Sequence, residues 1–110
     1  MNLINNVPGG PPPGGAYSPA VLHQNMVITA GHTGTHPTTG SVPDDLVAQI
    51  HLAIDNLELT LAASGSDLSR VLKTTCYLVD ISRFAEFNAA YAERFGAHLP
   101  ARSTVGVELA

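Results

Sequence analysis

Residues 41–65, SVPDDLVAQIHLAIDNLELTLAASG, are the segment around which the rest of the chain can be arranged. Ser41 precedes Asp44 by three residues, which is a capping-box-like helix start, and Pro43 suits a first turn. Gly65 is the residue type at which helices commonly end. Between them apolar residues recur at three- and four-residue steps: Leu46, Ile50, Ile54, Leu57 and Leu61. The stretch therefore predicts a long amphipathic helix.

The residues before this helix favour β-structure and then a loop. The runs AYSPAVLH (16–23) and MVITAG (26–31) are separated by Gln24 and Asn25, a spacing that predicts a tight β-hairpin. Residues 32–40, HTGTHPTTG, contain glycine and proline breaks and no periodicity, so they predict a loop.

Proline and glycine dominate residues 8–15, PGGPPPGG, where proline has no N–H and glycine allows almost any conformation. We therefore expect residues 1–15 to be a flexible leader. The ordered domain is expected to begin at Ala16.

After the first helix the sequence predicts a strand, a second helix and a last strand. Residues 71–79, VLKTTCYLV, are rich in strand-forming types. A helix is expected from Ser82 to Gly96, with an aromatic stripe on one face, and a strand over residues 102–109. The element order indicates an α+β domain in which two helices pack on one face of a mixed sheet.

Two helices can cover only one face of such a sheet. In the strand predicted over residues 71–79, alternation places Leu72, Thr74, Cys76 and Leu78 on one side. In the last strand it groups Arg102, Thr104, Gly106 and Glu108. This second set is polar and lightly charged, which favours association with other subunits and a pocket at the seam.

Composition excludes several classes of protein. With 110 residues and 45% hydrophobic content, the chain is long enough for one domain and too short for two. A net charge of −4, with five Lys and Arg in no run, argues against a nucleic-acid partner. One cysteine and the lack of a signal peptide or a long apolar run predict a cytoplasmic protein that does not enter a membrane.

Two further residue groups have plain structural explanations. His32 and His36 sit on a glycine-rich loop without a third nearby ligand, so pH-sensitive hydrogen bonding is favoured over a metal site. Cys76 lies in the middle of a strand among apolar neighbours, which favours a buried structural thiol over a nucleophile.

Four motifs together resemble the RidA family, also called YjgF or reactive intermediate deaminases. They are GAYSPAV (15–21), GSDLSRVLKTTCYLVD (65–80), FAEFNAAYAERF (84–95) and PARSTV (100–105), of which the last is the most specific. The resemblance runs from Ala16 onward. It implies a chorismate-mutase-like α+β fold and a homotrimer with a small-molecule pocket at each subunit interface.

Members of this family hydrolyse imines and enamines, such as 2-aminoacrylate, to 2-keto acids and ammonia without a metal or organic cofactor. By the resemblance, Arg102 would be the catalytic residue, because its planar fork can hold a substrate carboxylate. The resemblance also implies a set of substrate-binding residues: Tyr17, Gly31 through its backbone N–H, Phe84, Asn88 and Thr104.

Two of these residues also have structural alternatives. Asn88 lies beside the aromatic stripe, where an amide needs a buried partner, and a helix-to-loop hydrogen bond would serve equally. For Arg102 the alternative is a structural ion pair or a subunit contact.

The sequence also departs from the family pattern. Ala30, Gly31 and His32 stand where many members have Ser-Gly-Gln, and Gly106 stands where a glutamate is frequent. Many members continue into one more strand with a glutamate that is thought to position water, so we expect this sequence to be truncated before it. Glu108 is a poor substitute, since it lies roughly 20 Å beyond Arg102 along an extended strand.

Three functions follow as hypotheses. The first is imine deamination. The second is non-catalytic binding of small carboxylates or 2-keto acids in a regulatory role. An endoribonuclease is the least favoured, because the chain is acidic and lacks a basic groove.

Overall fold

The computed structural model describes residues 1–110 and contains five strands and two α-helices. The strands are β1 (Asn2–Ile4), β2 (Ala20–His23), β3 (Met26–Thr29), β4 (Lys73–Leu78) and β5 (Ala101–Gly106). The helices are α1 (Leu46–Ala63) and α2 (Phe84–Phe95), and short 3-10 turns at Leu68–Arg70 and Ile81–Arg83 precede β4 and α2. Neither helix has the length and apolar character needed to cross a bilayer. The α+β class is confirmed.

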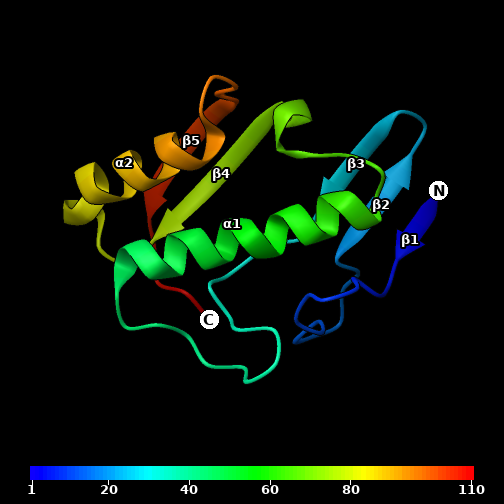
Figure 1. Ribbon diagram of the computed structural model, residues 1–110, viewed down its shortest axis with the longest axis horizontal. Coiled ribbons are helices and arrows are strands. Elements are labelled where there is room, and N and C mark those ends of the chain that lie inside the picture. Colours follow the sequence, from blue (N-terminus) through cyan, green and yellow to red (C-terminus); the bar gives the residue numbers. More distant parts are fainter.

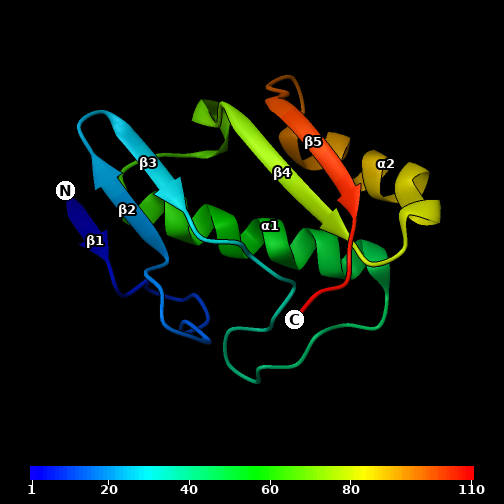
Figure 2. The ribbon, with the colours of Figure 1, turned by 180° about the vertical axis from the view of Figure 1, so that it is seen from behind.

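The strands form two sheets. β1, β2 and β3 are antiparallel neighbours, while β4 and β5 form a separate parallel pair. Both helices lie on the same side of the strands (Figure 1), as the view from behind also shows (Figure 2). The expectation of helices on one face is therefore confirmed. The expectation of one mixed sheet is wrong, because no ladder of backbone hydrogen bonds joins β3 to β4.

The domain begins earlier in the sequence than expected. β1 pairs with β2, with Leu3 opposite Val21, and Val7 is buried. The prediction that residues 1–15 form a leader outside the domain is therefore wrong for the first residues. A three-residue strand is too short to show a period of two, and only its pairing with the edge of β2 identifies it. Residues 8–15 contain neither helix nor strand, as predicted.

The predicted turn and helix ends are largely confirmed. Gln24 and Asn25 join β2 to β3, and Gln24 has a φ of 54°. Gly65 and Gly96 follow the two helices with φ of 78° and 59°, which glycine adopts without a steric penalty. α1 begins later than the sequence predicts. Its N-cap is Asp45, whose carboxylate accepts a 2.9 Å hydrogen bond from the Ala48 N–H, and not Ser41.

The hydrophobic core lies between the helices and the β4–β5 pair. It consists of seven buried residues: Ile50, Ile54, Leu78, Phe87, Ala90, Tyr91 and Phe95. The apolar face of α1 and the aromatic stripe of α2 therefore both point toward the strands, as the helical spacing predicted. α2 begins at Phe84, because Ser82 belongs to the preceding 3-10 turn, and β5 ends at Gly106 instead of residue 109.

The loop between β3 and α1 is fastened to α1 by buried polar contacts. Asn56, only 2% exposed, donates from Nδ2 to the carbonyl oxygens of Thr33 (3.1 Å) and Thr35 (2.8 Å). His32 Nε2 lies 2.8 Å from the Thr60 hydroxyl. At Gly34 the loop backbone approaches α1 so closely that an added Cβ would lie 2.6 Å from the Gln49 carbonyl oxygen.

This close approach predicts a stability cost for any side chain at Gly34. We expect Gly34→Ala to lower the free energy of unfolding by about 1–3 kcal/mol, because the loop must move away from α1. Gly31→Ala is the matched control, since nothing lies within 4 Å of its added Cβ. Urea unfolding of both variants measures the difference, and equal midpoints would contradict the predicted clash.

Burial of His32 predicts a pH dependence of stability. Burial lowers the pKa of His32 from its ordinary value of 6.5, so the unfolded chain binds this proton more readily than the folded chain. The stability contributed by neutral His32 is therefore fully present above about pH 6.5 and is lost as the pH falls through the folded pKa. We expect the free energy of unfolding to decrease between about pH 7.5 and 5.5, and His32→Gln to reduce this decrease. His98→Gln at an exposed position should leave it intact; the same pH profile for His32→Gln and the natural chain would refute the assignment.

Candidate functional site

Arg102 lies beneath the aromatic stripe of α2. Its guanidinium carbon is 5.4 Å from the ring centre of Phe84, 5.5 Å from that of Phe87 and 4.7 Å from that of Tyr91. We call these three rings the aromatic cage. All three distances are within the range of cation–π attraction. The cationic side chain is thus held over apolar rings instead of being solvated on an open surface.

The position of Arg102 contradicts the expectation that its side of the sheet is the face that associates with other subunits. Arg102 and Thr104 face the helices, as do Thr74, Cys76 and Leu78, because β4 and β5 are in register with Thr74 opposite Arg102. The open face instead carries the alternate residues of each strand, including Tyr77 paired with Val105. The polar set that was expected to be the associating face is therefore the covered one.

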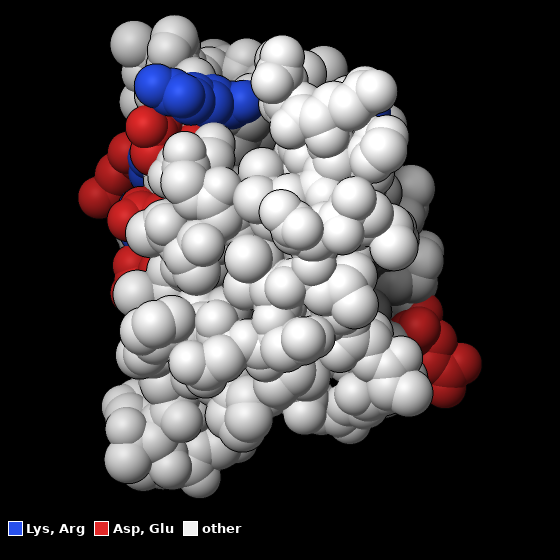
Figure 3. Space-filling model, turned by 90° about the vertical axis from the view of Figure 1, so that its right-hand side faces the viewer, with Lys and Arg blue, Asp and Glu red and all other residues white.

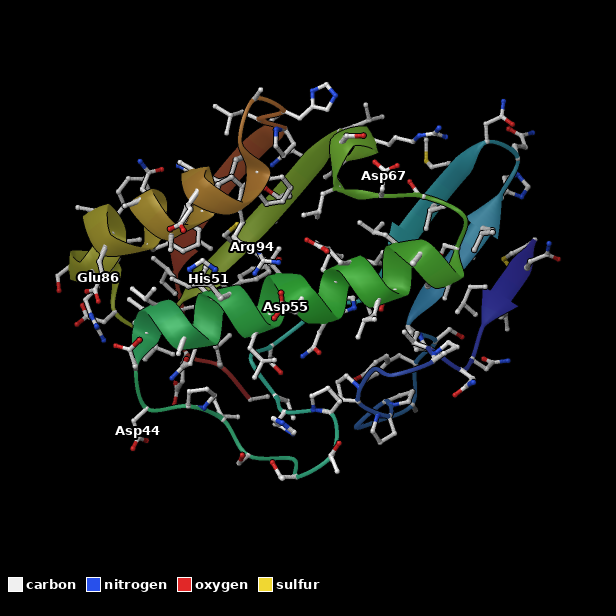
Figure 4. The ribbon with its side chains drawn as sticks, in the orientation of Figure 1. Asp44, His51, Asp55, Asp67, Glu86 and Arg94 are labelled. Atoms are coloured by element: carbon white, nitrogen blue, oxygen red, sulfur yellow. The ribbon has the colours of Figure 1, made fainter.

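No carboxylate in the chain neutralises Arg102. Arg70, Arg83 and Arg94 each have an acidic oxygen within 4.0 Å, and Arg94 pairs with both Asp55 and Glu58 between the helices (Figure 4). Arg102 has no such partner and no hydrogen-bond acceptor within the chain. The structural ion pair considered for Arg102 is therefore absent. Its planar fork of N–H donors is free to bind an external carboxylate in two parallel hydrogen bonds.

The groups around the guanidinium are neutral. Burial raises the pKa of the Cys76 thiol, which opposes a role as nucleophile and agrees with a structural thiol. Burial also raises the pKa of Tyr91, whose hydroxyl lies 2.7 Å from the Thr74 hydroxyl. The Thr104 hydroxyl is buried without a hydrogen-bond partner. The site therefore presents one fixed positive charge in an otherwise uncharged setting.

Phe84 and Asn88 form the rim of this site on α2. Phe84 is 37% exposed at the first position of the helix, and Asn88 is one turn further on, on the same side of the helix. Asn88 is exposed, so the expectation that its amide needs a buried partner is wrong. It remains available for a polar contact with a ligand.

Tyr17 and Gly31 lie elsewhere in the molecule. Both line a hollow of about 200 Å³ under the proline- and glycine-rich loop, together with His32, Asn56 and Thr60. Tyr17 is half-exposed, and its hydroxyl accepts a 3.1 Å hydrogen bond from the Gly14 N–H. In Figure 1 this loop lies right of centre, below β2, whereas β5 lies left of centre, beside α2. Within one chain, Arg102, Phe84 and Thr104 therefore lie together, with Asn88 at the rim. Tyr17 and Gly31 lie at the separate hollow.

The two loop histidines have hydrogen-bond partners of their own. His32 contacts Thr60, and the Nδ1 atom of His36 accepts from the backbone N–H groups of Thr38 and Thr39, both at 3.2 Å. No group of three or more His, Cys, Asp or Glu side chains is arranged to hold a metal ion.

The sequence pattern does not reveal the residues that surround Arg102. It places Phe87 and Tyr91 in the core stripe and Thr74 on a strand face. The helical spacing of Phe84, Phe87 and Tyr91 was visible, but only the pairing of β4 with β5 places the arginine beneath these rings. The contacts of Asn56 with the loop were also not predicted.

Known proteins resemble this chain along nearly its whole length. A family model described as Endoribonuclease L-PSP matches residues 9–110. The 2-iminobutanoate/2-iminopropanoate deaminase of Escherichia coli is 38% identical over 96 residues, which are 84% of this chain and 75% of that protein. Protein HMF1 of Saccharomyces cerevisiae is 38% identical over 92 residues, 84% of this chain and 71% of that protein.

The crystal structure of the YjgF gene product from Escherichia coli has the same fold. It matches with a TM-score of 0.90 and 35% identity, over 97% of this chain and 86% of that chain. The sequence match and the shared fold confirm the resemblance to RidA and YjgF proteins, and the chain belongs to the endoribonuclease L-PSP family.

Proposed function

We propose that this protein hydrolyses small imino acids and their enamine forms, of the 2-aminoacrylate type, to 2-keto acids and ammonia. The observation that carries the proposal is the unpaired guanidinium of Arg102 beneath the aromatic cage. Such a fork fits a substrate that has a carboxylate and little else to recognise. A relative named 2-iminobutanoate/2-iminopropanoate deaminase, at 38% identity, supports the choice of reaction.

The reaction needs orientation more than it needs reactive side chains. Water adds to the imine carbon to give a carbinolamine, the C–N bond then breaks, and ammonia leaves as the carbonyl forms. The overall change is imine plus water to ketone plus ammonia, with no oxidation or reduction. Arg102 would hold the carboxylate next to the imine carbon, and fixing that geometry lowers the entropic part of the barrier. Asn88 and the backbone N–H of Gly31 would donate to the nitrogen or oxygen of the reacting carbon.

We further propose that the full site forms between copies of the chain, as a homotrimer with a pocket at each seam. Tyr17 and Gly31 line the hollow under the proline- and glycine-rich loop, which Arg102 does not line, so a second copy would supply them. The open sheet face suits self-association, because Ile28 is 65% and Tyr77 55% exposed although both are apolar in character.

Charge also favours contact between copies. No Lys, Arg, Asp or Glu occurs before Asp44, and the end of the molecule that carries β1 to β3 is almost free of charged side chains (Figure 3). Such a surface can approach another copy without repulsion between like charges.

The free, half-buried Cys76 needs no oxidising compartment, and we place the protein in the cytoplasm.

The proposal makes Arg102 necessary for activity. We expect Arg102→Ala to lower kcat/KM for enzymatically generated 2-aminoacrylate roughly 10- to 100-fold, because charge-assisted hydrogen bonds to the carboxylate are lost. Arg102→Lys should recover only part of the loss, since a lysine keeps the charge but not the fork. Pyruvate and ammonia release above the buffer rate is the measurement.

The same assay separates the alternatives. An unchanged rate in Arg102→Ala would sink the deaminase assignment. Binding of pyruvate by calorimetry without any acceleration would indicate a carboxylate-binding protein instead. RNA cleavage that persists in highly purified protein and is lost in Arg102→Ala would favour the endoribonuclease, although three of the five basic residues are already paired with acids.

Self-association through the open face is tested separately. Light scattering should give a mass three times the 11.5 kDa of one chain. Val105→Asp should lower the mass to that of a monomer, because a charge on an apolar contact must be desolvated. Ala62→Asp, an exposed position on α1, is the control and should leave the mass unchanged. A monomeric natural chain would refute the shared site.

A further inference from the structure

We propose that Tyr91 is a positioning residue for Arg102 and that the Thr74 hydroxyl holds Tyr91 in place. The inference rests on the proposed function only in assigning a carboxylate ligand to Arg102. The inference concerns where the guanidinium lies before a ligand binds, and it can be tested without measuring catalysis.

Tyr91 is the nearest of the three rings to the guanidinium, at 4.7 Å. It is 5% exposed and stacks on Phe95 at a centroid distance of 4.5 Å with 27° between the planes. Its ring is therefore covered by Phe95 and also lies close to Arg102. A ring held in this way can act as a fixed surface for a planar cation.

The Thr74 hydroxyl adds the constraint that packing alone does not supply. It lies 2.7 Å from the Tyr91 hydroxyl, which fixes the outer end of the ring. Thr74 is also the register partner of Arg102 across the β4–β5 pair, so the two side chains rise from adjacent backbone positions on the same face. The strand that anchors the ring is thus the strand that pairs with the arginine.

This arrangement gives the polar pair a purpose beyond stability. A carboxylate that binds in two parallel hydrogen bonds requires the guanidinium plane to be oriented before the ligand arrives. Without an acidic partner to orient it, Arg102 depends on the rings. Loss of the Thr74–Tyr91 hydrogen bond lets the ring and the guanidinium next to it sample other orientations, which weakens binding without removing any ligand contact.

The test compares Tyr91→Phe, Thr74→Val and the double variant with the natural chain. Each single variant removes one hydroxyl and keeps the size of the side chain. We expect each to weaken pyruvate binding, measured by calorimetry, about 3- to 10-fold. The double variant should be no weaker than either single variant, because both remove the same hydrogen bond.

A spectroscopic readout separates positioning from general stability. The Nε–H resonance of Arg102, assigned by its loss in Arg102→Lys, should be shifted by the ring current of the aromatic cage. It should move toward the range of exposed arginines in Tyr91→Phe and in Thr74→Val. Ser64→Ala is the matched control: it removes a buried hydroxyl hydrogen bond to the Thr60 carbonyl at the end of α1 and should change neither the resonance nor the affinity.

The outcomes distinguish this inference from the proposed function. If Arg102→Ala loses pyruvate binding while both hydroxyl variants bind like the natural chain, the positioning role is wrong and the carboxylate site stands. If the natural chain neither binds pyruvate nor accelerates its release from 2-aminoacrylate, the proposed function is wrong, and the resonance alone decides the positioning role. An Arg102 signal unchanged in both hydroxyl variants overturns it.

Discussion

The parallel pairing of β4 with β5 is the constraint on which the site depends. Two parallel strands that follow each other in the sequence require a crossover, and α2 supplies it. The crossover places the aromatic stripe of α2 over one face of the pair. The register then puts Arg102 on that face, beside Thr74 and under the rings of Phe84, Phe87 and Tyr91. A shift of one residue in β5 would turn the arginine to the opposite face.

The electrostatics of the chain single out the same residue. Arg70 and Arg83 pair with acids on exposed surfaces, where such pairs contribute little to stability. Arg94 pairs with two carboxylates between the helices. Arg102 is stabilised by aromatic faces instead, which leave its N–H groups without acceptors. A binding site for a small anion needs a positive charge that is stable where it lies and N–H donors that are not already hydrogen-bonded.

The other half of the molecule contributes shape more than charge. Asn56, His32 and the close approach at Gly34 fix the loop after β3 against α1, so Gly31 has a defined place at the end of the hairpin. Residues 1–43 contain no Lys, Arg, Asp or Glu, and strands β1 and β3 expose Leu3 and Ile28 on the open face. The candidate site residues are divided between the hollow under the proline- and glycine-rich loop and the surroundings of Arg102, which is why the proposed function includes association of copies.

What could be read from the sequence was local in origin. The spacing of Leu46, Ile50 and Ile54 predicted α1 and the aromatic stripe predicted α2, because a helix repeats every 3.6 residues. The glycines at 65 and 96 marked the helix ends, which need particular backbone angles. The PARSTV motif identified the family and pointed to Arg102. Tertiary structure decided the rest. β1 is defined by its pairing with β2, and Asp45 prevails over Ser41 as the cap because it lies next to the first helical turn. The face of Arg102 is set by its pairing with Thr74, 28 residues earlier in the sequence, and a contact of that kind depends on the packed chain and leaves no periodic signal in the sequence.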